Sequence, residues 1–176
     1  MKKVLLLIPA LVLAVALTLP VATPATACSG ITLIAGGGSH EDEIIVGAIT
    51  VSEDAEFIYV TYFTGGWQLK ETHVAVGVCV NGTCQGIPLN KKGNPKVGNF
   101  PYSDSHGPDP TYQYQYAIPR DESWTAGTTL CIAAHAVVYS ACQDQEETAW
   151  VGYCNYDERL EFPGRSWATY ICYTVQ

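Results

Sequence analysis

The segment Phe57-Ile58-Tyr59-Val60-Thr61-Tyr62-Phe63 contains only aromatic and β-branched residues. These residue types favour a pleated, partly buried surface, so the segment predicts a β-strand. Both alternating sets of side chains are apolar or aromatic, which is typical of a strand that is buried on both sides. The fold is therefore expected to be built around strands.

Seven other segments are rich in Val, Ile, Thr and Tyr and are bounded by Gly, Pro, Asp or Asn, which indicates further strands. They are Ile31–Ala35, Ile44–Ser52, Leu69–Val80, Tyr112–Ile118, Thr129–Ser140, Ala149–Cys154 and Trp167–Val175. No segment keeps a helical period over three turns. About eight short strands predict an all-β fold, an antiparallel β-sandwich with disulfides.

The N-terminus has the features of a secretory signal peptide. Lys2 and Lys3 precede an apolar run from Val4 to Leu19, and Ala25-Thr26-Ala27 resembles a small-residue cleavage site. The expected organisation is a signal peptide over residues 1–27 and a single β-sandwich domain over residues 28–176. The sequence predicts a secreted protein at the cell surface, without a transmembrane segment in the mature chain.

The chain is acidic, with a formal net charge of −8 and a pI of about 4.8. An acidic surface repels nucleic acid, so we expect no binding to DNA or RNA. The Gly- and Pro-rich stretch from Asn90 to Pro110 is expected to be a long loop that carries Lys91, Lys92 and Lys96. A basic loop on an acidic body would favour head-to-tail contact between subunits, although a solvated surface loop is the favoured interpretation.

Six of the seven cysteines are expected to form three disulfides in an oxidising compartment. These six are Cys79, Cys84, Cys131, Cys142, Cys154 and Cys172. An Asn81-Gly82 turn would place Val80 opposite Thr83 and Cys79 opposite Cys84, which predicts a Cys79–Cys84 disulfide. Three connectivities stay open for the other four, of which Cys142–Cys154 with Cys131–Cys172 is favoured.

Two single positions suggest covalent modification. Cys28 directly follows the expected cleavage site, so it is expected to carry a lipid, to pair between subunits, or to be a free or internally paired thiol. Asn81-Gly82-Thr83 fits an N-glycosylation sequon on an exposed turn, which makes Asn81 a candidate acceptor.

Catalytic and metal motifs are weak in this sequence. His73 and His135, with Glu71 and Glu147, are the candidate metal ligands, but the sequence lacks the His-x-x-x-His and Cys-x-x-Cys spacings. Strand histidines satisfied by hydrogen bonds are the favoured interpretation. A Gly-x-Ser-x-Gly elbow is also missing. We therefore expect no enzyme activity, no metal and no cofactor.

Aromatic residues suggest sugar binding as one alternative. Tyr112, Tyr114 and Tyr116 would lie on one side of a strand, where exposed rings can stack on sugar faces. Tryptophans at four further positions could do the same. The competing interpretation is that the tyrosines line the core or an assembly interface.

Several segments together resemble an uncharacterised secreted all-β domain of bacterial and archaeal surface proteins. The matching segments are GGWQL (65–69), ETH (71–73), IPLN (87–90), KGNP (92–95), GNFPY (98–102), AAHAVV (133–138), ETAW (147–150) and WATY (167–170). The Asn81-Gly82 hairpin is an addition to this pattern. The resemblance implies an extracellular location and no particular reaction.

The expected function is that of a secreted, non-catalytic structural module, assembling with copies of itself into a filament or surface layer. Residues 30–35 are short and apolar and precede three glycines, so Ile31, Leu33 and Ile34 could form a strand donated to a neighbouring subunit. An ordinary first strand in its own sheet is the favoured alternative. The alternative function is a carbohydrate-binding module with a polysaccharide partner.

Overall fold

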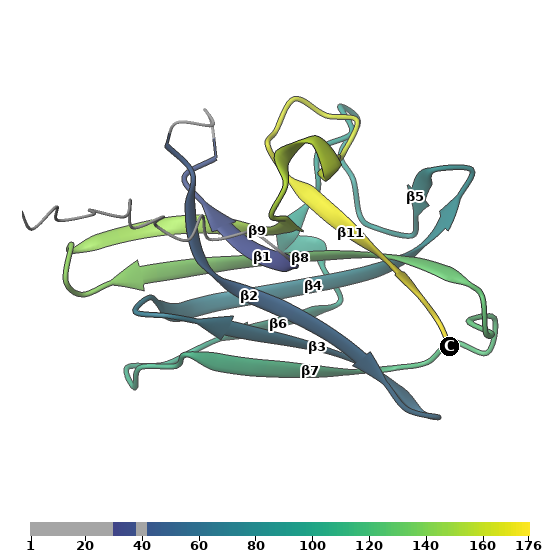
Figure 1. Cartoon of the computed structure of the whole chain (residues 1–176), viewed down its shortest axis with the longest axis horizontal. Coiled ribbons are helices and arrows are strands. Elements are labelled where there is room, and N and C mark those ends of the chain that lie inside the picture. The colour runs from purple at the N-terminus through teal and green to yellow at the C-terminus, as the bar shows by residue number, and fades with distance from the viewer. Residues whose placement is uncertain (1–29, 38–41) are drawn as a thin grey trace, which may run out of the picture.

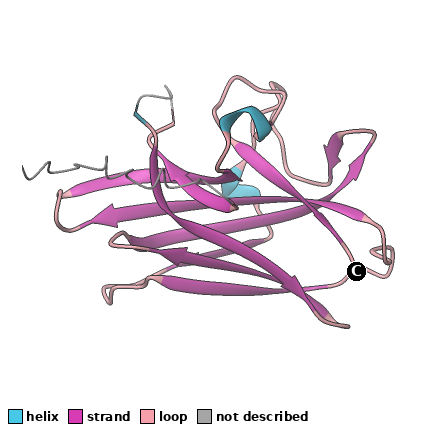
Figure 2. Ribbon diagram, in the orientation of Figure 1, coloured by secondary structure: helices cyan, strands magenta, loops and turns pink. Residues whose placement is uncertain are grey.

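The computed structural model describes residues 30–37 and 42–176, and within them the chain is built of β-strands (Figures 1 and 2). The strands are β1 (Ile31–Ala35), β2 (Ile44–Glu53), β3 (Phe57–Thr64), β4 (Gln68–Val80), β5 (Thr83–Gln85), β6 (Tyr102–Ser105), β7 (Gln113–Pro119), β8 (Thr129–Ser140), β9 (Gln145–Tyr153), β10 (Leu160–Glu161) and β11 (Thr169–Thr174). Short 3-10 turns occupy Val97–Asn99 and Tyr156–Glu158. The predicted all-β class is confirmed.

All strand pairs are antiparallel and belong to one strongly curled sheet. The strands follow the order β10-β11-β8-β9-β1-β2-β3-β7, while β4 pairs with β8 and carries β5 and β6. Curling brings the half with β3 and β7 opposite the half with β4 and β8 (Figure 1). The Leu69 amide donates to the Thr111 carbonyl at 2.7 Å, close to where the two halves meet. The arrangement is therefore sandwich-like, with the main core between the two halves.

The strand β3 contributes only one face to this core. Ile58, Val60 and Tyr62 are fully buried, whereas Tyr59 is partly exposed and Phe63 is exposed. The expectation that residues 57–63 are buried on both sides is therefore wrong. The aromatic residues on the outer face stay at the surface, where the Tyr59 hydroxyl donates to the Asp54 carboxylate at 2.6 Å.

The strand that is buried on both faces is β8, which is inaccessible along most of its length. Its inner side chains, such as Ile132 and Val138, join the main core. On the outer face, Cys131 and Ala133 lie in a second cluster, which also contains Ile87, Phe100, Trp150, Phe162 and Tyr170. This outer cluster needs the segments around residues 87–100 and 160–170 as its cover.

The stretch Asn90–Pro110 is more ordered than a structureless loop, so that prediction is wrong. It contains a 3-10 turn and the strand β6, which pairs with β4. Phe100 is buried in the outer cluster, which fixes the segment to the sheet. The side chain of Asn90 accepts hydrogen bonds from the backbone amides of Lys92 and Asn94 and closes a tight turn. Lys91 and Lys92 are exposed at this turn.

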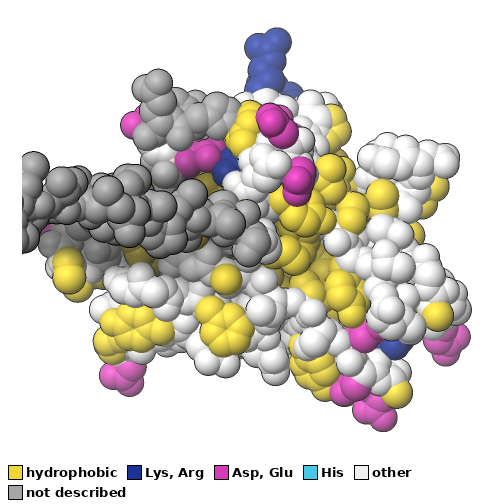
Figure 3. Space-filling view, viewed as in Figure 1, with side chains coloured by type: hydrophobic (Ala, Val, Ile, Leu, Met, Phe, Trp, Pro, Cys, Tyr) yellow, Lys and Arg dark blue, Asp and Glu magenta, His cyan; other side chains and the backbone are white. Residues whose placement is uncertain are grey.

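Surface chemistry differs between regions of the molecule. On the face seen in Figure 3, hydrophobic side chains gather where β11 runs in Figure 1, and acidic side chains lie beside the upper end of this patch and at the lower right. Among the residues that the structure describes, no helix has the length and apolar character needed to cross a membrane.

Candidate functional sites

The strand β1 lies inside the chain's own sheet, between β2 and β9. It is antiparallel to both neighbours, and the Thr32 hydroxyl donates to the Gly152 carbonyl at 3.1 Å. Leu33 is 0% exposed and Ile34 is almost fully buried, while Ile31 packs at the border of the core. The three residues expected to form an assembly strand therefore occupy a central position that stabilises the sheet.

A sharp turn follows β1. Gly36 has φ +76°, and a Cβ at this position would lie only 2.5 Å from the Asp42 carbonyl oxygen. A side chain here would clash with backbone, so glycine is required where the chain leaves β1.

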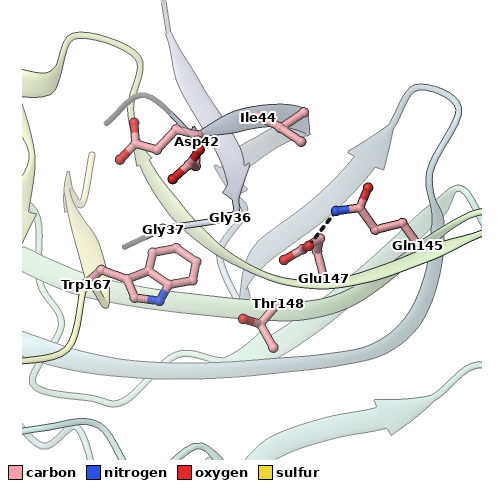
Figure 4. A pocket seen from close by; sticks show the side chains of 9 residues that line it. Gly36, Gly37, Asp42, Ile44, Gln145, Glu147, Thr148 and Trp167 are labelled. Carbon is pink, nitrogen blue, oxygen red and sulfur yellow. Dashed lines mark hydrogen bonds between the residues drawn. The ribbon is translucent and has the colours of Figure 1, made fainter. Parts of the chain in front are cut away.

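A cavity of about 670 Å³ opens beside this turn (Figure 4). Its lining includes Trp167 and the carboxylates of Asp42, Glu43 and Glu147. Arg159 forms an ion pair with Glu43 at 2.6 Å, and the Gln145 amide donates to Glu147 at 2.6 Å. An indole beside carboxylate and amide groups can bind a sugar or an amine through stacking and hydrogen bonds.

The three tyrosines of the predicted aromatic stripe have different environments. Tyr112 is 45% exposed, Tyr114 is half-buried and Tyr116 is 9% exposed. The Tyr116 hydroxyl donates to the Thr72 carbonyl at 2.9 Å, and the Tyr114 hydroxyl bonds the Asp104 carboxylate. Burial raises the pKa of Tyr116 to about 12. Tyr114 and Tyr116 thus link β7 to β4 and β6, and only Tyr112 presents a largely open ring.

The two strand histidines are neighbours on the outer face. His73 and His135 are directly paired across β4 and β8, with ring centroids 5.5 Å apart. Burial, with a smaller effect of His73, lowers the pKa of His135 to about 4. Glu71 lies 3.4 Å from His73, but Glu147 pairs with Val138 and is not part of this group. In residues 30–37 and 42–176, no three His, Cys, Asp or Glu side chains are placed to hold a metal ion.

The predicted hairpin forms with the expected register. Asn81 and Gly82 both have positive φ, Val80 faces Thr83, and Cys79 faces Cys84. The disulfide nevertheless joins Cys84 to Cys131, with Cα atoms 5.8 Å apart. A Cβ at Gly77, which pairs with Cys131, would lie 2.0 Å from the Gln85 carbonyl oxygen. The bare Gly77 backbone lets the end of β5 cross β4 toward β8.

The predicted disulfide connectivity is therefore wrong at three places. Cys79–Cys84 does not form because Cys131 is the bonded partner of Cys84, and the same bond excludes Cys131–Cys172. Cys142–Cys154 does not form either, because Cys142 is a free, exposed thiol and Cys154 is bonded elsewhere. Cys79 and Cys172 are free thiols. Connectivity depends on which strands become neighbours, and local spacing did not reveal the position of β8.

The remaining predicted positions have separate fates. Asn81 is exposed at the hairpin tip, so its predicted accessibility is confirmed, while its glycosylation stays a prediction. Cys28 and the signal peptide over residues 1–27 lie outside the described residues.

Sequence reasoning missed Gly77 and the grouping of Asp42, Glu43 and Trp167. A glycine inside an apolar strand signals close backbone approach, so Gly77 was detectable in principle. The cavity combines three segments that are distant in sequence and gave no local signal.

Comparisons with protein-family models, curated proteins and solved structures returned no significant match.

Proposed function

We propose that this chain is a secreted, non-catalytic structural module of the cell surface that assembles with copies of itself by exchanging β1. The observation that carries the proposal is the position of β1. This strand pairs along both of its edges and precedes a run of three glycines, residues 36–38.

Exchange of β1 would conserve the contacts of the folded subunit. A β1 strand from a second copy could form the same backbone hydrogen bonds with β2 and β9 and place Leu33 and Ala35 in the same core positions. Replacing an intramolecular element by an identical intermolecular one is a low-cost route to assembly. Strand addition of this kind derives affinity from main-chain bonds and specificity from alternate side chains.

Other features support an extracellular location. The N-terminal sequence has the charged, apolar and small-residue regions of a signal peptide. A disulfide such as Cys84–Cys131 is typical of oxidising compartments. The resemblance to a secreted domain of surface proteins points to the same location.

A strand-complementation experiment tests the proposal. A variant lacking residues 29–38 should lose self-assembly, because the β2 and β9 edges have no strand to receive. A fluorescent peptide of residues 29–38, added during refolding, should bind this variant and restore its folded state. The readouts are fluorescence anisotropy for binding and circular dichroism for folding.

The matched control is the same peptide with Leu33→Asp, which would place a charge at a fully buried position. We expect this peptide not to bind. Assembly of the deletion variant without peptide, or equal binding of the two peptides, would rule out β1 exchange.

The cavity around Trp167 favours a second candidate function, carbohydrate binding. Its indole could stack on a sugar ring, while Glu147 and Gln145 accept and donate hydrogen bonds. In a glycan panel, Trp167→Ala should abolish the fluorescence change that a bound glycan causes. Trp124 is not among the residues that line the cavity, so Trp124→Ala is the control and should keep this change. An unchanged response of Trp167→Ala would exclude this cavity as the sugar site.

A further inference from the structure

Four cysteines from four strands converge on the outer face of the sheet. Cys79 is directly opposite Cys84 in the β4–β5 pair, and Cys172 is directly opposite Cys131 in the β8–β11 pair. The Cys84–Cys131 disulfide links one member of each pair. The two free thiols, Cys79 and Cys172, therefore flank an existing disulfide.

These two free thiols are also neighbours. The Cys79 side chain lies close enough to the Cys172 thiol to influence its titration. Both side chains are partly buried against the outer cluster that contains Cys131 and Tyr170. The strand register keeps them near each other, because each thiol lies directly opposite one cysteine of the Cys84–Cys131 disulfide.

The partly buried environment of Cys172 lowers the reactivity of its thiol. Burial, reinforced by the neighbouring Cys79, raises the pKa of the Cys172 thiol to about 11. A thiol with this pKa is almost entirely protonated at neutral pH, and only the thiolate is a good nucleophile. Its reaction partner is therefore expected to be determined by proximity, which favours Cys79.

We propose that Cys79 and Cys172 are the site of a second disulfide, which forms beside Cys84–Cys131 and ties the β4–β5 hairpin to the C-terminal strand β11. The two bonds together would join β4, β5, β8 and β11 at one point. This proposal does not depend on assembly through β1.

The oxidant is an external disulfide, either on an extracytoplasmic thiol–disulfide oxidoreductase or in a small molecule such as oxidised glutathione. The Cys79 thiolate attacks one sulfur of this disulfide, forms a mixed disulfide and releases one thiolate. Cys172 then loses its proton and attacks the Cys79 sulfur, which expels the second thiolate. The two cysteines lose two electrons and two protons, and the external disulfide gains them as two thiols.

Disulfide mapping of the full mature chain tests the proposal. The protein is oxidised with a glutathione redox buffer, denatured in N-ethylmaleimide without reductant, digested and analysed by mass spectrometry. We expect one linked peptide pair containing Cys79 and Cys172, a second containing Cys84 and Cys131, and alkylation at Cys142, the exposed free thiol.

Two variants provide the controls. Cys142→Ser should remove the alkylated site and leave the Cys79–Cys172 peptide unchanged. Cys172→Ser should restore alkylation of Cys79. Alkylation of both Cys79 and Cys172 in the oxidised wild-type protein would overturn the proposal. A disulfide map with Cys79 joined to Cys84 and Cys131 joined to Cys172 would also overturn it. Both contradicting outcomes are measured on the wild-type protein, so they do not depend on whether the variants fold.

Discussion

Tyr62 connects the two halves of the curled sheet through its hydroxyl group. This fully buried residue of β3 places its hydroxyl oxygen 2.9 Å from the His73 carbonyl on β4 and 3.2 Å from the His135 carbonyl on β8. Burial raises its pKa well above the usual value, so the hydroxyl stays protonated and can donate. Tyr62 thus contributes both a hydrogen bond across the core, through its hydroxyl, and apolar contacts, through its ring.

Tyr62→Phe removes this donor and keeps most of the ring contacts. We expect the free energy of unfolding, measured by urea denaturation, to fall by about 1–2 kcal/mol, because the carbonyl oxygens lose a buried partner. Tyr59→Phe is the matched control on the same strand. Its hydroxyl bonds Asp54 at the surface, so the expected change is within about 0.5 kcal/mol. Equal losses in the two variants would contradict this role of Tyr62.

His135 predicts a pH dependence of stability. Its pKa is about 4 in the folded protein because of burial and the neighbouring His73, whereas an unfolded histidine has a pKa of about 6.5. The unfolded chain therefore binds the proton more tightly. The stability contributed by neutral His135 is present above about pH 6.5 and is lost as the pH falls toward 4, by up to roughly 3 kcal/mol.

Urea denaturation between pH 7 and pH 4.5 measures this effect. Carboxylic acids in general begin to titrate in the same range, so the relevant quantity is the difference between wild type and His135→Gln. The variant should lose less stability on acidification than wild type. Parallel pH profiles would show that His135 does not change its protonation on unfolding.

The β4–β5 hairpin and Gly77 decide which cysteines meet. A Cβ added at Gly77 would lie 2.0 Å from the Gln85 carbonyl oxygen, so β5 must move away from β4 to admit it. Gly77→Ala should therefore destabilise the fold by about 2 kcal/mol or more and lower the yield of the Cys84–Cys131 bond. Melting temperature and disulfide mapping are the measurements.

Gly98→Ala is the control, because a Cβ at this position would have no atom within 4 Å and the φ of Gly98 is not positive. We expect little change in the melting temperature of this variant. A Gly77→Ala protein with normal stability and a complete Cys84–Cys131 bond would refute the close approach at Gly77.

At the scale of elements, local patterns predicted most strands and the hairpin register. The bounds of β1 and β8 agree with the prediction, and β3 extends one residue further than expected. The short strand β6 has the polar sequence Tyr-Ser-Asp-Ser, which lacks the apolar alternation that identifies a strand. The Cys84–Cys131 disulfide and the cavity depend on β8, β9 and β11 becoming neighbours of distant segments. A local sequence pattern does not show which distant segments become neighbours.

At the scale of the whole molecule, β1 has two possible sources in an assembly, the same chain or a neighbouring copy. It supplies one of the central strands of the curled sheet, and its side chains contribute to the main core. A folded subunit therefore needs some copy of this strand, and the glycine run after it provides a link with no side chains. The acidic net charge of −8 opposes nonspecific association, so the proposed assembly depends on the exchanged strand.

Negative-stain electron microscopy of the mature protein, residues 28–176, without reductant tests the central claim most directly. Self-assembly through β1 predicts ordered filaments or lattices that disappear when residues 29–38 are deleted. Uniform single particles of wild-type protein, or ordered assemblies that persist in the deletion variant, would contradict the account.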